Sequence, residues 1–487
     1  MSRREGLARY GDVDGAYLER RRLDKHAGWV LLWALGVGAV ISGDYFGWNF
    51  GLAHAGFSGL AVATVLMAVM YVCMVFSIAE LSAALPHAGG FYSFTRSAFG
   101  PLGGFVCGVT DTIEYVLTPA VIVIGIGGYL SQLFGGGNEY AWWTAVYVMF
   151  VAINMRGAEL TLKLGLVITA AAVLVLLVFY AGAIFSGAFD PALLSNIPPD
   201  PGQSAEWLPK GWSGVFAALP FAIWFYLAIE QLPLAAEETH DVVRDMPRAM
   251  IAGIMTLLAL SGLTLVLNTG VGGGAAAIAE SDAPLALGFS AVFGGGTTST
   301  MLTLVALIGL IASFHTIIYA YGRVLFALSR AGYFPRWISV TGRRRTPHRA
   351  LLLGGVIGLA CAVLIEETGG DGAPVGATLV NMAVFGAVIS YIMVMASFVV
   401  LRMRRPDLPR PYRSRLGVPG AVLGGILAAV ALVATFSVED FRPGVWGVAI
   451  FLTVAVLYFL LYSRHRLVAQ APEEEVALLE EAGREIR

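Results

Sequence analysis

Long apolar runs separated by short polar segments dominate the chain. A transmembrane helix needs about 20 predominantly apolar residues, with a range of about 17 to 25. Runs of roughly that length occur about twelve times, near residues 28–52, 57–85, 101–133, 140–155, 160–187, 212–236, 248–272, 298–330, 349–365, 376–402, 417–437 and 443–463. The pattern predicts an all-α polytopic membrane protein with about 12 transmembrane helices, embedded in a lipid bilayer.

The composition agrees with a membrane protein and excludes several other classes. The 487 residues are 57% hydrophobic and 13% charged, whereas a soluble domain is about 25% charged. A net charge of −2 argues against a nucleic-acid partner. The three cysteines lie within apolar runs, so we expect no disulfide framework. Residues 1–27 are polar and arginine-rich and lead directly into the first run, unlike a cleavable signal peptide.

No motif of an enzyme, cofactor site or metal site stands out. Glycine clusters at 272–274 and 294–296 lack the strand and helix that flank a nucleotide-binding motif. The spacing of histidines and cysteines does not fit a metal site. We therefore expect neither an enzyme nor a bound cofactor.

Basic residues concentrate in every second polar segment. They occur in 3–25, at Arg96, Arg156, Lys163, Arg244 and Arg248, in 330–349 and 402–415, and from Arg464 onward. The intervening segments hold only Lys210 and Arg442 but many acidic residues. Because cytoplasmic loops carry the excess of lysine and arginine, both termini are expected in the cytoplasm of a multi-pass cell-membrane protein. The even number of runs agrees.

The first apolar run contains a segment unsuited to a lipid-facing helix. Residues 36–51 read G-V-G-A-V-I-S-G-D-Y-F-G-W-N-F-G, with Asp44 near the middle. Each glycine costs about 1 kcal/mol of helix propensity, and a charge at this depth costs a few kcal/mol or more. Irregular backbone survives there only where it lines a cavity or is buried in protein. We predict that the helix is unwound at about 41–45 and forms half of a substrate site.

The sixth run contains a similar interruption. Residues 224–233 read W-F-Y-L-A-I-E-Q-L-P, which places Glu230 and Pro233 inside an apolar helix. Proline removes a backbone hydrogen bond, so unwinding is expected around 226–230. Runs 1 and 6 each open a block of five. Matching breaks in two halves are typical of a 5+5 inverted-repeat transporter whose site lies at the membrane midplane.

Acidic residues of the third run favour a cationic ligand. Asp111, Glu114 and Thr118 lie at i, i+3 and i+7, on one helical face. With Asp44, Glu114 and Glu230, a cavity at the membrane midplane would contain three carboxylates. The sequence shows no clear lysine or arginine at that depth to neutralise them. Excess negative charge attracts cations, and the aromatic residues Trp48, Trp224, Phe225 and Tyr226 could bind one through their ring faces.

Four short motifs relate the chain to a known family. They are I-S-G-D-Y-F at 41–46, P-H-A-G-G-F-Y at 86–92, A-A-E-E-T followed by P-R-A at 235–249, and R-A-G-Y-F-P at 330–335. In this order the chain resembles the amino acid–polyamine–organocation transporters over essentially its whole length. The segments 40–49, 113–119 and 309–319 look most like ethanolamine permeases. The resemblance implies a LeuT-like fold and gradient-driven uptake or exchange of a small amine by alternating access.

This reading gives a set of expected site residues. The expected substrate-binding residues are Ala39, Ile41, Ser42, Gly43, Asp44, Glu114, Thr118, Trp224, Tyr226, Leu227 and Glu230. Candidates for a coupling ion or proton are Glu230, Glu114, Ser313, His315 and Thr316. The resemblance assigns Trp224 to an aromatic gate. Some bacterial members have a lysine in the fifth span, but this chain has none near Ala172, which leaves proton and sodium coupling both open.

Structural alternatives exist for these residues. Glu230 could link the two unwound segments, and Glu114 could be a neutral acid hydrogen-bonded inside the bundle. Asp44 could face an external vestibule without touching substrate, and Trp224 could simply pack. For His315 a hydrogen bond between helices is the main alternative.

The expected organisation is a cytoplasmic segment 1–27, a ten-helix transport core 28–402 with halves 28–187 and 212–402, two helices in 417–463, and a cytoplasmic tail 464–487. Within the tail, Val476, Leu479 and Ile486 fall roughly on one helical face, which predicts a short surface helix or a regulatory segment.

The favoured function is secondary active transport of a small cationic amine, with ethanolamine as the preferred substrate and a proton or sodium ion, or exchange, driving it. An amino acid permease of the same superfamily is the first alternative. In that case the amides of residues 42–44 would bind a carboxylate. A transporter-like sensor is the alternative from another class. The oligomeric state is left open.

Overall fold

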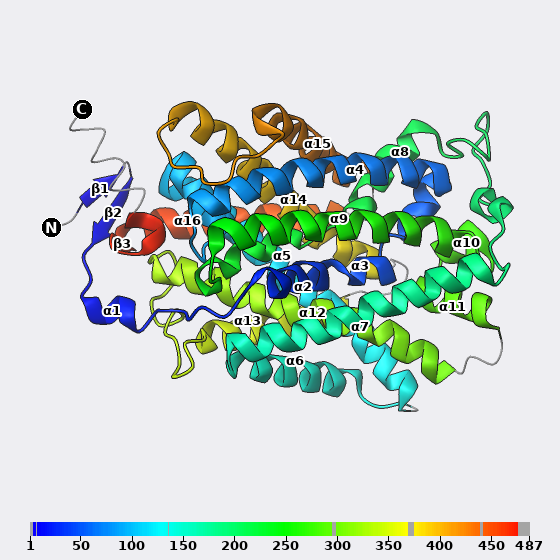
Figure 1. Cartoon of the computed structure of the whole chain (residues 1–487), viewed down its shortest axis with the longest axis horizontal. Helices are drawn as coiled ribbons and strands as arrows, with labels where there is room; N and C mark the ends of the chain where they lie inside the picture. Colours follow the sequence, from blue (N-terminus) through cyan, green and yellow to red (C-terminus); the bar gives the residue numbers. More distant parts are fainter. Residues whose placement is uncertain are drawn as a thin grey trace.

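Helices running back and forth along one direction make up most of the molecule (Figure 1). The computed structural model describes residues 3–5, 7–134, 136–294, 299–368, 375–438 and 442–475. The helices at the predicted runs are α2 (Trp29–Val40) with α3 (Ser42–Tyr45), α4 (Phe50–Ala84), α5 (Phe91–Leu133), α6 (Glu139–Met155), α7 (Ala158–Phe185), α8 (Gly211–Ile223) with the 3-10 helix η2 (Ile229–Glu238), α9 (Val242–Thr269), α12 (Ser299–Arg330), α13 (His348–Thr368), α14 (Val375–Arg404), α15 (Gly417–Ser437) and α16 (Arg442–Leu461). The predicted all-α polytopic membrane architecture is confirmed.

The lengths of these helices separate continuous spans from interrupted ones. Nine helices in the described part of the chain are long and apolar enough to cross a membrane. Of the other predicted spans, α6 has 17 residues. The first and sixth spans are each divided into two shorter pieces, as their glycines, acids and proline predict.

Two helices begin earlier than the apolar runs because a glycine bends the chain. In α4 the backbone turns at Gly56, with φ of 68°, and in α5 it turns at Gly100, with φ of 79°. Glycine adopts a positive φ at little cost, and Pro101 after the second bend suits the first turn of a new helical segment. Each kink therefore joins a short helix to the main span.

Short elements cover the two ends of the helices. Between α9 and α12, where the sequence analysis placed only a glycine-rich loop, lie α10 (Gly274–Ala279) and α11 (Pro284–Phe293). At the opposite end lie α1 (Gly15–Glu19) and a three-stranded sheet of β1 (Arg3–Glu5), β2 (Ala8–Gly11) and β3 (Leu467–Val468) (Figure 1). The connecting turns include η1 (Pro191–Ser195) and η4 (Ser463–His465).

The small sheet joins the beginning of the chain to its tail. Strand β2 pairs antiparallel with β1 and parallel with β3. After β3 the chain folds back into the molecule, and Glu473 and Glu474 are 1% and 0% exposed. Within the described part of the tail, these two glutamates are thus buried, whereas Glu475 is exposed. The predicted helical face at Val476, Leu479 and Ile486 lies outside the described residues.

Candidate functional site

The first span is interrupted close to the predicted place. Helix α2 ends at Val40, and Ile41 forms a turn before the short helix α3. The larger departure follows α3, where Phe46 is extended and Gly47 has a φ of 95°. The interruption is therefore present, but the predicted unwinding at 41–45 is wrong in extent. Ser42 to Tyr45 keep one helical turn, and the irregular backbone runs from Phe46 toward the start of α4.

The sixth span is interrupted between Ile223 and Ile229. Helix α8 ends at Ile223, five residues in turns follow, and η2 then begins. Ala228 has a left-handed backbone with φ of 82°, an uncommon conformation for a residue with a side chain. The Glu230 side chain stabilises it, since Oε1 accepts a hydrogen bond from the Ala228 N–H at 3.0 Å. This agrees with the predicted break around 226–230.

The two interruptions touch each other through backbone and rings. A Cβ atom on Gly43 would lie 2.1 Å from the carbonyl oxygen of Trp224, so only glycine allows this approach. The Phe46 and Trp224 rings meet edge to face at 5.9 Å, and Trp48 stacks on Phe225 at 5.4 Å. The predicted aromatic residues therefore surround the contact between the two breaks.

Glu114 and Glu230 lie together beside the sixth-span break. Their carboxyl groups interact, and Glu230 Oε1 also accepts a 2.6 Å hydrogen bond from the Tyr391 hydroxyl. Both side chains are buried. Neither Glu114 oxygen, nor Glu230 Oε2, has an N–H or O–H donor among the described residues. Such buried acceptors are uncommon and would be satisfied by a shared proton or by a bound cation.

Asp44 belongs to a different polar group from this acid pair. Its Oδ1 accepts a hydrogen bond from the Thr264 hydroxyl at 3.0 Å, and Thr264 in turn contacts the Tyr180 hydroxyl at 2.6 Å. Its Oδ2 has no hydrogen-bond partner within the part of the chain described. The structure thus brings Glu114 and Glu230 together but directs Asp44 toward α7 and α9.

The remaining predicted site residues are buried in or beside the breaks. Those on the interrupted spans are Ala39, Ile41, Ser42, Tyr226 and Leu227. Tyr226 contacts the Ser261 hydroxyl at 2.9 Å. Thr118 is buried on α5, but its hydroxyl donates to the Glu114 carbonyl of its own helix at 2.7 Å. Thr118 is therefore engaged by its own backbone in this conformation.

The three coupling candidates on α12 differ in what they contact. Ser313 links α12 to both pieces of the first span, because its Oγ accepts from the Ser42 N–H at 3.0 Å and donates to the Gly38 carbonyl at 2.9 Å. The Thr316 hydroxyl donates to carbonyls of its own helix. His315 Nε2 lies 2.9 Å from the Thr161 carbonyl, which is the helix-to-helix contact weighed as the alternative.

A pocket of about 200 Å³ adjoins the first break on the side away from the small sheet. Tyr45 and Phe46 form its inner wall, and Asp282 and Glu366 line its outer part. Because these side chains are acidic, the pocket would attract cations from the outside. Within the described residues, no group of three or more histidine, cysteine, aspartate or glutamate side chains could hold a metal ion.

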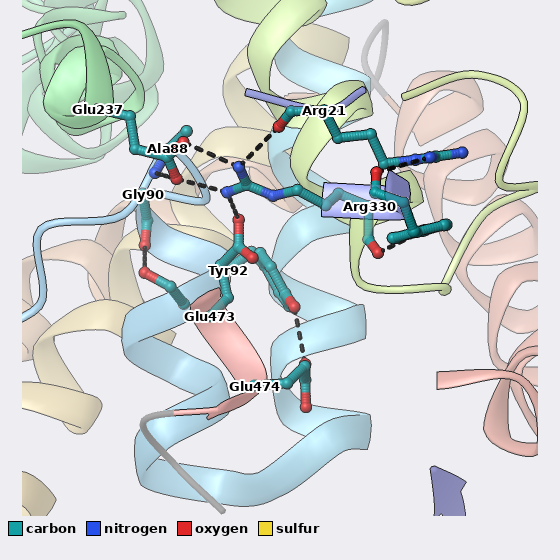
Figure 2. Close-up of polar contacts among 10 residues, drawn as sticks. Arg21, Ala88, Gly90, Tyr92, Glu237, Arg330, Glu473 and Glu474 are labelled. Carbon is teal, nitrogen blue, oxygen red and sulfur yellow. Dashed lines mark hydrogen bonds and ion pairs between the residues drawn. The ribbon is translucent and has the colours of Figure 1, made fainter. Parts of the chain in front are cut away.

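The sequence analysis missed a network of buried ion pairs at the end near the small sheet. Arg330 at the end of α12 is hydrogen-bonded to Glu237 of η2, to Glu473 of the tail at 2.5 Å and to the Arg21 carbonyl at 3.3 Å (Figure 2). About two turns earlier on α12, Arg323 pairs with Glu238 at 3.0 Å. Three of these residues, Glu237, Glu238 and Arg330, lie in motifs that served only for the family resemblance.

Glu474 extends this network to α5 and the first strands. It accepts hydrogen bonds from Arg96 at 2.6 Å and from the hydroxyls of Tyr10, Tyr92 and Tyr333 at 2.7 to 2.9 Å. Figure 2 shows Tyr92 directed at Glu474. The acidic run at 473–475 in the sequence signalled charge, but nothing in its spacing indicated burial against arginines of other segments. We call the side chains of Arg96, Glu237, Arg330, Glu473 and Glu474 the terminal network.

Continuous spans, two broken helices that meet, and buried acids beside them define a polytopic helical membrane transporter. The sequence model described as "Amino acid permease" matches residues 28–461. The chain therefore belongs to the amino acid permease family, which lies within the superfamily that the motifs resemble.

Relatives described as transporters or permeases agree with this assignment. An uncharacterized transporter of Rhizobium meliloti is 31% identical over 397 residues, 80% of this chain and 81% of that protein. The branched-chain amino acid permease BcaP of Bacillus subtilis is 25% identical over 478 residues, 93% and 96% of the two chains. The aromatic amino acid transport protein AroP of Salmonella typhimurium is 22% identical over 456 residues, 92% and 96%. These names do not support the finer resemblance to ethanolamine permeases.

The contact between the breaks gives a first prediction. Gly43→Ala should destabilise the protein by about 1–3 kcal/mol, the usual cost of overpacking, because the new methyl group would collide with the Trp224 carbonyl. Thermal unfolding of the purified protein in detergent measures this. Gly262→Ala is the matched control, because a Cβ there meets no atom within 4 Å. Equal melting temperatures for both variants would show that the breaks do not touch at Gly43.

The terminal network gives a second prediction. Glu474→Gln removes the charge that Arg96 pairs with, and breaking a buried pair costs about 3–5 kcal/mol. We expect a lower melting temperature and faster proteolytic removal of the tail. Glu475→Gln is the control, since Glu475 is the exposed neighbour. If the two variants unfold and are cleaved alike, the tail does not dock through Glu474.

Proposed function

We propose that the protein is a secondary active amino acid permease of the cell membrane, with both termini in the cytoplasm. Its substrate would bind where the two breaks meet, and the helices would give access alternately to either side. The proposed core is the ten-helix region 28–402, with α15 and α16 beside it. The family assignment supports transport, and the names of the relatives support an amino acid rather than another amine.

The observation that carries the proposal is the unsatisfied acid pair. Three oxygens of Glu114 and Glu230 are buried without a donor from the described residues. A substrate ammonium group supplies three N–H donors and a positive charge. It would therefore satisfy the pair, while a proton shared by the two carboxyls would do so in its absence. This exchange of a proton for an ammonium group supports proton coupling through Glu114 and Glu230.

The other end of an amino acid would lie at the first break. The Ser42 N–H donates to the Ser313 hydroxyl at 3.0 Å, a partner that a substrate carboxylate could replace. Trp224 lies against Phe46, and its indole N–H has no acceptor in the described part of the chain. We propose that this ring closes over the bound substrate.

Ethanolamine is the second candidate, and Asp44 is the observation that favours it. Asp44 is 0% exposed and lies two residues from Ser42. A buried carboxyl group disfavours a second anionic group near it, so a substrate with an ammonium group and no carboxylate avoids this repulsion. Both candidate substrates would place their ammonium group at the acid pair. They differ only in the group that would lie at the first break.

The role of the acid pair is tested by neutral substitution. Glu114→Gln and Glu230→Gln should each reduce uptake into proteoliposomes at least about tenfold, because hydrogen bonds to a charged group contribute about 1.5–3 kcal/mol. The control is Glu280→Gln at the end of the molecule away from the small sheet, where the side chain is exposed. This variant should leave uptake unchanged. Reconstituted amounts and melting temperatures establish that each variant is folded. Normal uptake by both site variants would remove the electrostatic basis of the proposal.

Substrate class is tested by uptake under imposed gradients. Because the ammonium group displaces the shared proton, which then crosses in the opposite direction, we expect labelled leucine or phenylalanine to accumulate when the inside is acidic, with weaker or no inhibition by ethanolamine and choline. Accumulation of ethanolamine without competition by amino acids would establish the second candidate instead. A dependence on a sodium gradient but not on a pH gradient would contradict proton coupling through Glu114 and Glu230.

A further inference from the structure

An apolar groove runs down the membrane-facing side between α5, α12, α13 and α16. It has a volume of about 450 Å³, and its walls include Val116 of α5, Leu325 of α12, Leu353 and Ile357 of α13, and Phe451 of α16. The hydroxyl of Thr112, which also lines it, donates to the Gly108 carbonyl of its own helix at 2.7 Å. The groove therefore offers no polar group to a ligand along most of its length.

The position and length of the groove suit a lipid chain. Ile357 and Phe451 on its rim are 42% and 47% exposed, so it opens outward from the bundle. Its lining reaches from Ile338, in the connection after α12, to Gly447 of α16. Gly447 precedes the end of α16 by 14 residues, a depth of about 21 Å at 1.5 Å per residue. Because these helices span a membrane, hydrocarbon rather than water lies outside the groove.

At the end near the small sheet, the groove continues into a basic pocket. This second pocket, of about 470 Å³, shares Phe334 and Pro335 with the groove, and its other walls include Arg336, Trp337, Tyr462, His465 and Arg466. Trp337 is 51% exposed. Tryptophan and tyrosine are enriched at the level of the lipid headgroups. The pocket therefore lies where a headgroup would be if a chain filled the groove.

Arg336 and Arg466 are available to an anion. Arg336 donates to the Arg466 carbonyl at 3.1 Å, and Arg466 donates to the Tyr462 hydroxyl at 2.7 Å and lies over the Tyr462 ring at 4.2 Å. No carboxylate of the described residues forms an ion pair with either guanidinium. The arginines of the terminal network, at the same end, are by contrast paired with glutamates.

We propose that this groove and pocket together bind one anionic phospholipid. One acyl chain lies along α5, α13 and α16, and the phosphate group lies between Arg336 and Arg466. An apolar channel joined at one end to two unpaired arginines matches a molecule with a long chain and an anionic head. Basic pockets between transmembrane helices at a membrane surface are typical sites for such headgroups.

The site connects the bilayer to the segments that carry the terminal network. The pocket is also lined by Gly11 of β2 and by Gly332, and Tyr333 beside it donates to Glu474. Strand β3 follows directly after Arg466. A bound lipid would therefore hold β2, the connection after α12 and η4 together. The proposal stands apart from the transported substrate, because none of the predicted substrate residues lines either pocket.

The test compares lipid binding by matched variants. The purified full-length protein, delipidated in neutral detergent, is titrated with dioleoylphosphatidylglycerol or dioleoylphosphatidylcholine, and bound lipid is counted by native mass spectrometry. We expect one phosphatidylglycerol to bind in preference to phosphatidylcholine and to raise the melting temperature. Arg336→Gln with Arg466→Gln should weaken phosphatidylglycerol binding about 30-fold, since each arginine near a lipid surface contributes about one factor of five.

The control for charge is Arg343→Gln with Arg413→Gln, two exposed arginines outside the pocket. The groove is tested by Gly447→Leu, because a side chain there meets no protein atom within 4 Å and would occupy the chain's position. Its control is Gly262→Leu, which is equally open but lies on α9. We expect Gly447→Leu to reduce lipid binding and Gly262→Leu to leave it unchanged.

Several outcomes would overturn the proposal. Equal binding of the two lipids, or an unchanged preference in the double arginine variant, would remove the headgroup site. Normal binding by Gly447→Leu would show that no chain occupies the groove. Lipid-free dimers that dissociate on Gly447→Leu substitution would identify a second copy as the occupant.

Discussion

The close approach of Gly43 to the Trp224 carbonyl is the constraint on which the rest of the structure depends. Backbone groups released by a broken helix find no water in the hydrocarbon core, and each unsatisfied group costs several kcal/mol. Here side chains in and beside the breaks supply partners for such groups. The Ala228 N–H bonds to Glu230, the Ser42 N–H bonds to Ser313, and the Leu35 carbonyl accepts from Gln231 at 3.0 Å. The polar residues in these apolar spans are there because the breaks require them.

Charge is arranged in opposite ways at the breaks and at the end near the small sheet. Beside the breaks, Glu114 and Glu230 have no described basic partner, and their carboxyl oxygens are partly unsatisfied. In the terminal network, every arginine meets a glutamate, and Arg330 meets two. Burying a charged group is energetically unfavourable unless the group is paired. The unpaired acids are therefore the basis of the proposed binding region, whereas the paired arginines and glutamates hold segments together.

Sequence patterns were sufficient for the long helices and for the existence of both breaks, but not for the short helices α10 and α11. Apolar length identified each span, and glycine, proline and acids inside runs 1 and 6 identified the interruptions. The exact extent of the first break was not accessible, because Ser42 to Tyr45 keep a helical turn through contacts with α12. The sequence analysis placed three acids in one cavity, and the structure brings only two of them together. Helical spacing places Glu114 on a face, but which of Asp44 and Glu230 it meets depends on how separate helices pack. The burial of Glu474 depends on four distant donors, none visible in local pattern.

The terminal network, together with the neighbouring Arg323–Glu238 pair, determines what must happen for this end of the molecule to open. Arg330 and Arg323 tie α12 to Glu237 and Glu238 at the end of η2, so the sixth and eighth spans cannot separate there while the pairs persist. Burial favours the paired state, because an arginine or glutamate left alone in a dry interior costs several kcal/mol. Water entering the region removes that penalty by solvating each charge separately. Opening at this end therefore has to be accompanied by hydration of the network, or else η2, α12 and the tail must move as one unit.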